Sequence, residues 1–160
     1  MKKAKDGIKV RGFYRVQLTA PDDPTQIVGD SGWKENLVVN LGFNQYLVQS
    51  LGTGLTGKKV SHMAIGTGGA PAAADTTLAG EQSVRAAITA ATSSGSKTLR
   101  CTATFDSTAS FVTASKNISN IGLFNTSTAS GDTIFAGNTY TSSACATNQN
   151  VNATYDIIFA

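Results

Sequence analysis

Apolar and polar residues alternate in several segments of this chain, and strict alternation predicts a β-strand with one buried face. The pattern is clearest in residues 151–159. Their apolar face consists of Val151, Ala153, Tyr155, Ile157 and Phe159. Residues 8–18, 33–40, 60–65, 98–105 and 134–140 follow the same period. Residues 118–124 are largely apolar, which predicts a strand buried on both faces.

Turn-forming residues separate these segments. The run Pro21-Asp22-Asp23-Pro24 predicts a turn, because proline fixes φ and aspartate bonds to the local backbone. Residues 25–28 then return as the second strand of an N-terminal hairpin. Residues 82–92 are alanine-rich and are compatible with a strand or a helix. In total, we expect about eight short strands.

The period changes between residues 41 and 51. Phe43, Leu47 and Leu51 are spaced four apart, which predicts one short amphipathic α-helix with these residues on its buried face and Tyr46 beside them. Asn40 is a candidate N-terminal cap, and Gly52 is a candidate left-handed residue that ends the helix.

Composition supports an all-β class. Thr, Ser, Ala and Gly make up nearly half of the 160 residues, and strong helix formers such as Lys, Glu, Gln and Arg are sparse. Many short strands separated by turns predict a β-sandwich or a barrel. We predict an antiparallel β-sandwich, immunoglobulin-like or jelly-roll-like, with one short α-helix. The whole chain, 1–160, forms one domain, with residues 1–30 as a basic N-terminal arm and hairpin.

The net charge of +3 is unevenly distributed. Residues 1–15 contain six basic residues and one acidic residue, whereas the rest of the chain has a small negative charge. Such an arm predicts contact with an acidic protein surface, or else a solvated tail followed by an edge strand. The absence of interleaved aromatic and basic residues argues against nucleic acid. The partner-binding candidates of the arm are Lys2, Lys3, Lys5, Lys9, Arg11 and Arg15.

Motifs for catalysis or cofactor binding are missing from the sequence. The loop Gly66–Pro71 is rich in glycine, but the Gly-Lys-Ser/Thr of a phosphate-binding loop is absent. His62 is the single histidine, and no serine lies in a Gly-x-Ser-x-Gly context. We therefore expect no enzyme, no cofactor, no metal and no small-molecule substrate. Glu81 and Arg85 are expected to form an exposed ion pair on a helical turn.

No apolar run is long enough to cross a membrane, and no apolar segment follows the basic start as in a signal peptide. We therefore expect a chain that stays in a reducing cytosol. There, Cys101 and Cys145 are expected to be free thiols rather than a disulfide.

Several motifs, in order along the chain, resemble small virion structural proteins of tailed bacteriophages. They are Asn36–Gly42, Ala64–Pro71, then Asp75–Leu78 with Glu81 and Arg85, and finally Ile121–Asn125 followed by residues 131–136. The resemblance covers about residues 30–160. Where members of this family often have an acidic residue and an arginine, this chain has Asn120 and Gly137.

The resemblance implies a structural component of the virion, assembled in the host bacterial cytoplasm. We expect a capsid decoration or cement protein that binds the major capsid protein and forms a homo-oligomer. The candidate contacts are the arm and, secondarily, Gly66, Gly68, Gly69 and Pro71. A tail, neck or baseplate component is the alternative. A third possibility is a fibre-tip receptor-binding module in which Trp33, Tyr14 and Tyr140 form an apolar shelf for a sugar.

Overall fold

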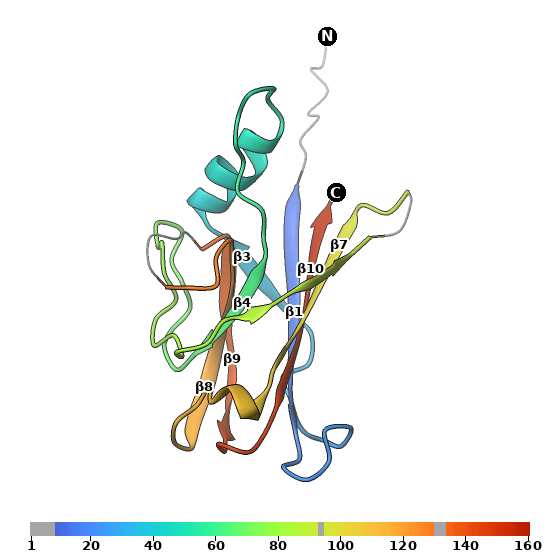
Figure 1. The fold of residues 1–160 in the computed structure, drawn as a ribbon. Helices are drawn as coiled ribbons and strands as arrows, with labels where there is room; N and C mark the ends of the chain where they lie inside the picture. Colours follow the sequence, from blue (N-terminus) through green and yellow to red (C-terminus); the bar gives the residue numbers. More distant parts are fainter. Residues whose placement is uncertain (1–8, 93–94, 130–133) are drawn as a thin grey trace.

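The computed structural model describes residues 9–92, 95–129 and 134–160. Within them, ten strands form one antiparallel sheet that is nearly closed into a barrel (Figure 1). The strands are β1 (Val10–Thr19), β2 (Ile27–Asp30), β3 (Lys34–Val38), β4 (His62–Gly66), β5 (Ala86–Ala87), β6 (Thr89–Ala91), β7 (Thr98–Phe105), β8 (Lys116–Phe124), β9 (Ala136–Cys145) and β10 (Val151–Phe159). Their order is β5-β4-β8-β9-β3-β1-β10-β7-β6, with β2 beside β1.

Two segments form the corners of the barrel, because each pairs with a different strand along its length. In β3, residues 34–36 pair with β1, and residues 37–38 pair with β9. In the alanine-rich segment, β5 pairs with β4, and β6 pairs with β7 immediately afterwards. Strands that change partner in this way turn a sheet through a corner. The all-β antiparallel class with one short helix is confirmed, whereas an immunoglobulin-like or jelly-roll sandwich is not.

The N-terminal hairpin is part of the barrel wall. β1 pairs with β10 over its whole length, from Val10 opposite Phe159 to Leu18 opposite Val151. On its other side it pairs with β3 and β2. Residues 10–19 are therefore part of the barrel wall and do not form a projecting arm. The candidates Lys2, Lys3 and Lys5 lie outside the described residues.

The barrel interior is filled by side chains from the alternating strands. Tyr14, Tyr140 and Tyr155 lie at its centre, with ring centroids 6.3 Å apart for Tyr14 and Tyr140 and 6.1 Å apart for Tyr14 and Tyr155. The Tyr14 hydroxyl donates a hydrogen bond to the Thr139 carbonyl. Burial raises the pKa of Tyr14 to about 12, so its hydroxyl stays protonated. Large aromatic side chains that fill the interior make it a packed core rather than a channel.

A loop between β4 and β5 covers the outer face of β4 and β8. Asn120 is fully buried, and its side-chain amide donates to the Gly69 carbonyl at 3.0 Å and to the Ala79 carbonyl at 2.9 Å. Beneath the loop, a second apolar cluster contains Val39, Ala64, Leu78, Phe124 and Ile134. This cover explains why residues 120–124 are buried on both faces, as their apolar run predicts.

Glu81 and Arg85 form the ion pair that their spacing suggests, but the prediction of an exposed pair on a helix is wrong. The Arg85 side chain is 2% exposed and its guanidinium lies 3.7 Å from the centre of the Phe124 ring. Its Nη2 donates to Glu81 Oε2 at 2.9 Å. The segment between the two residues is a loop, and the stacking on Phe124 holds the arginine inside the protein.

The predicted helix is present, but its type and its buried face differ from the prediction. Residues Gly42–Leu47 form a π-helical turn (η1) and Val48–Ser50 a 3₁₀ turn (η2). Tyr46 is buried, packing edge-to-face on Phe135 at 5.2 Å, whereas Phe43 and Leu51 are exposed. No side chain caps the start, so Asn40 is not a cap. The positive φ belongs to Gly54 and not to Gly52.

Both cysteines are free and buried. Burial raises the pKa of each thiol to about 11, and only the thiolate is a strong nucleophile. We expect the folded protein to show no rapid reaction with an aromatic disulfide reagent near pH 8, and two reactive thiols per chain in denaturant. The measurement is absorbance of the released thiolate. Rapid modification of the native protein would contradict the burial of both thiols.

Candidate docking surface at the helix end

One end of the barrel carries a segment that projects beyond the strands. The helical turns η1 and η2 and the loop after them extend from the end at which β10 terminates (Figure 1). Four large apolar side chains of this segment are exposed to solvent. Their exposed fractions are 41% for Phe43, 58% for Val48, 87% for Leu51 and 56% for Leu55. Apolar side chains gathered on one exposed segment indicate a binding surface.

A pocket of about 310 Å³ lies at the foot of the same segment. Tyr46, Leu47 and Ser50 contribute one side, and Leu99, Ile157 and Phe159 of the barrel strands contribute another. Mouths of β-barrels are common positions for binding sites, and mostly apolar walls are typical of them. We call the four exposed apolar residues and this pocket together the apical surface.

Lysines surround the apical surface. Lys58 and Lys59 line the pocket, and the Lys58 amide donates to the Gln45 carbonyl at 2.9 Å, which fixes the loop against the helix. The backbone of Lys97 accepts a hydrogen bond from Phe159, and Lys9 pairs with Ala160, so both lysines lie at this end of the barrel. Residues 42–60 contain no acidic residue. The apical surface therefore favours a partner with negative charge.

The arginines predicted as partner contacts form ion pairs within the chain. Arg11 donates to Glu35 at 3.0 Å and Arg15 to Asp30 at 3.0 Å, on the outer face of the wall. Arg100, on β7, makes two hydrogen bonds to Asp156, at 2.8 and 2.7 Å. The Arg11 and Arg15 pairs neutralise a face that is basic in the sequence of β1 alone. Of the arm candidates that the structure describes, Lys9 is the exposed cation at the helix end.

The glycine-rich loop has a clear structural role. Gly66 and Pro71 are buried, Gly68 is half-buried and Gly69 is exposed. A Cβ on Gly68 would lie 2.5 Å from the Ala79 carbonyl oxygen, and Gly80 has a φ of +64°. Both positions require glycine, because the two arms of the loop are hydrogen-bonded closely together. That the loop also contacts a partner stays a prediction, which applies best to Gly69.

The predicted sugar shelf is wrong, because its aromatic residues face opposite sides of the wall. Tyr14 and Tyr140 are in the core, with 0% and 8% exposure. Trp33 is 46% exposed on the outside, with its ring centre 5.7 Å from the Arg100 guanidinium. The three rings therefore cannot contact one sugar.

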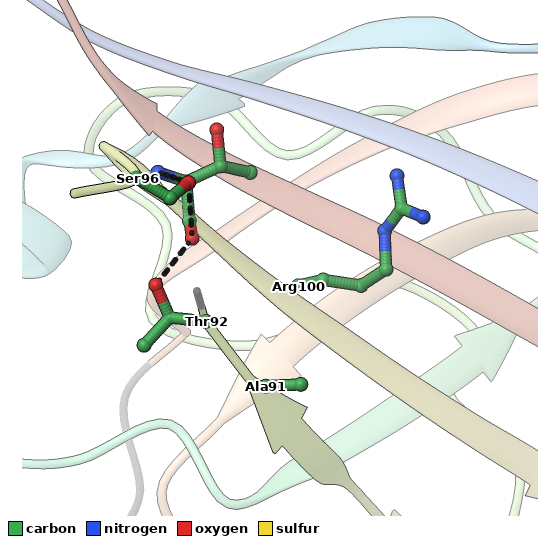
Figure 2. A pocket seen from close by; sticks show the side chains of 5 residues that line it. Ala91, Thr92, Ser96 and Arg100 are labelled. Carbon is green, nitrogen blue, oxygen red and sulfur yellow. Dashed lines mark hydrogen bonds between the residues drawn. The ribbon is translucent and has the colours of Figure 1, made fainter. Parts of the chain in front are cut away.

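A second depression lies on the outer face of β6 and β7. Figure 2 shows Thr92 and Ser96 on one side and the Arg100 side chain apart from them. The Thr92 hydroxyl donates to the Thr98 carbonyl at 2.9 Å, and the Thr98 amide donates to the Ser96 hydroxyl at 3.0 Å. Arg100 is held by Asp156. The polar groups of this depression thus bond to their own chain, which makes it a weaker candidate than the apical surface.

His62 is half-buried, and its Nδ1 lies 2.8 Å from the Ser61 hydroxyl. Burial and the nearby Arg85 lower the pKa of this imidazole. Among the described residues, no group of three or more His, Cys, Asp or Glu is arranged to hold a metal ion. The described part of the chain also contains no helix long and apolar enough to span a membrane.

The described residues form an all-β, nearly closed barrel-like sheet with exposed apolar side chains at one end. Searches against protein-family models, curated proteins and solved structures return no match for the chain.

The Arg15–Asp30 ion pair is expected to make the stability of the fold depend on pH. The hydrogen bond from Arg15 is the main reason that the pKa of Asp30 lies well below its usual 3.8. A carboxylate with a lowered pKa stabilises the fold at neutral pH, and this contribution is lost as the pH falls through the folded pKa. The pair is exposed, so we expect Asp30→Asn to lower Tm by about 2–4 °C at pH 7. The difference in Tm between this variant and wild type should shrink below pH 3, as measured by thermal unfolding followed by circular dichroism. A constant difference at every pH would contradict this assignment.

Proposed function

We propose that this chain is a structural protein of a tailed-bacteriophage virion, and specifically a capsid decoration or cement protein. It binds the outside of the major capsid protein lattice and stabilises contacts between capsid subunits. Two lines of argument support the proposal. One is the ordered set of motifs that resembles small phage virion proteins. The other is the apical surface, which has the chemistry of a protein-binding site.

The observation that carries the proposal is the exposure of Phe43, Val48, Leu51 and Leu55 on one projecting segment. Apolar area in water is unfavourable by roughly 25 cal/mol per Å², and burial against a partner recovers that free energy. A partner that covers these side chains thus gains affinity without any catalytic group. The barrel beneath them already has a packed core, so docking does not require it to fold.

Charge supports a capsid surface as the partner. Lys9, Lys58, Lys59 and Lys97 lie at the helix end, and the arm adds Lys2, Lys3 and Lys5 in the sequence. Acidic loops on the outside of a capsid would steer the protein toward this end and orient it there. Copies bound at neighbouring lattice positions would then form a homo-oligomer. The immunoglobulin-like or jelly-roll arrangement of the strands stays a prediction, and the proposal does not depend on it.

The experiment is a count of copies per particle. Intact virions of the phage that encodes the chain are purified and analysed by quantitative mass spectrometry, with the major capsid protein as the internal reference. Hundreds of copies per particle are the expected result. Between six and a few dozen copies would overturn the decoration role in favour of a tail, neck or baseplate position, and absence from particles would overturn a virion role altogether.

A further inference from the structure

We propose that the apical pocket receives a single aromatic or long aliphatic side chain of the partner protein, set between carboxylates in a short acidic segment. The inference rests on the proposed function only in taking that partner to be a virion protein. It assigns the pocket, and not merely the exposed helix, as the place where the partner is recognised.

The size and walls of the pocket fit such an anchor. Its volume of about 310 Å³ is at the lower end of the range of ligand sites. Tyr46 and Phe135 supply aromatic surface, and Leu99 and Ile157 supply aliphatic surface. Binding energy at protein interfaces concentrates where one large side chain fills a desolvated pocket, with weaker contacts around it. The exposed Phe43, Val48 and Leu51 supply those surrounding contacts from the same helical turns.

The charges around the pocket determine which residues of the partner can flank the anchor side chain. Lys58 and Lys59 are part of its lining, and Lys97 lines the adjoining depression that shares Leu99 and Phe159 with it. Among the residues that the structure describes, none of those lining either depression is acidic. A partner segment with carboxylates beside its apolar anchor would pair with Lys59 and Lys97, whereas a basic segment would be repelled.

The pocket is open and adjoins exposed apolar side chains, which favours a side chain presented by a protein over an enclosed lipid. A direct test uses short synthetic peptides with the full-length protein. The probes are acetyl-Glu-Leu-Phe-Glu-amide, its charge-reversed form acetyl-Lys-Leu-Phe-Lys-amide, and acetyl-Glu-Ala-Ala-Glu-amide, which lacks the anchor. Binding is followed by ¹H–¹⁵N NMR at low salt, with dodecanoate as a separate arm.

We expect the first peptide to shift the amides of residues 46–50, 58–60 and 157–159, with a dissociation constant near the millimolar range. The other two peptides should bind at least about fivefold more weakly. Equal binding of the charge-reversed peptide, or shifts elsewhere on the barrel, would overturn the inference. Dodecanoate binding more tightly than the first peptide would also overturn it, in favour of a lipid site.

Variants test the same site from the protein side. Lys59→Glu should weaken binding of the first peptide by about fivefold, whereas Lys34→Glu makes the same charge change on β3, outside the pocket, and should not. Val60→Trp should fill the pocket and abolish binding, with folding checked by its thermal transition. Unchanged binding by Lys59→Glu and by folded Val60→Trp would overturn the assignment.

The two proposals fail separately. If the protein is absent from virions but binds the acidic peptide in the pocket, the pocket inference stands and the virion function does not. If the protein decorates capsids but Val60→Trp binds them as tightly as wild type, the function stands and the pocket inference does not.

Discussion

Arg85→Ala is expected to lower the free energy of unfolding by about 3–5 kcal/mol. The wild-type arginine stacks on Phe124 and donates to Glu81 at 2.9 Å, and its side chain is 2% exposed. Truncation leaves the Glu81 carboxylate, whose side chain is 12% exposed, without this cation, and it opens a cavity beside the ring. Urea unfolding followed by circular dichroism measures the loss.

The matched control is Arg11→Ala. Arg11 also pairs with a glutamate, Glu35, at 3.0 Å, but these side chains are 51% and 56% exposed. Solvent screens an exposed pair, so the expected loss is small beside that of Arg85→Ala. The double variant Glu81→Leu/Arg85→Leu should recover much of the stability, because it removes the buried charge together with its partner. Equal losses for Arg85→Ala and Arg11→Ala would show that burial does not determine the strength of this pair.

The strands follow from local patterns, and this is why most of them can be read from the sequence. Alternation in residues 98–105 and 151–159 determines which side chains face inward, and the pairing of Cys101 with Tyr155 places both in the core. The corners are different. Nothing in residues 34–38 or 86–91 signals a change of partner, because the change depends on how the sheet curves over its whole width.

Ion pairs between strands that are distant in the sequence could not be predicted from the sequence either. The basic residues of β1 suggest a charged binding face, but Glu35 and Asp30 meet them only after β2 and β3 fold back. Likewise, Arg100 and Asp156 are 56 residues apart and become neighbours through the register of β7 and β10. Net charge along a segment therefore overstated the positive potential of this face.

The helix shows how one apolar stripe can mislead. The four-residue spacing predicts that Phe43, Leu47 and Leu51 form the buried face. In the structure, the π-helical turn instead places Tyr46 against Phe135. One signal in the sequence was informative. Residues 43, 46, 47, 48 and 51 are all apolar, which is more than a single buried stripe needs. The excess apolar residues are the ones that the structure leaves exposed at the apical surface.

The double variant Phe43→Asp/Leu51→Asp is expected to reduce binding to capsids by at least about 100-fold. It places two charges where the proposed partner buries apolar surface, and it adds negative charge opposite acidic capsid loops. Because Phe43 is 41% and Leu51 87% exposed, the thermal transition should change little. Binding is measured by sedimentation of the purified protein with heads that lack it. The matched control is Ile27→Asp/Val28→Asp on β2, whose residues are 49% and 52% exposed at the other end of β1. If the control pair lost binding as strongly as the helix pair, the docking surface would lie elsewhere on the barrel.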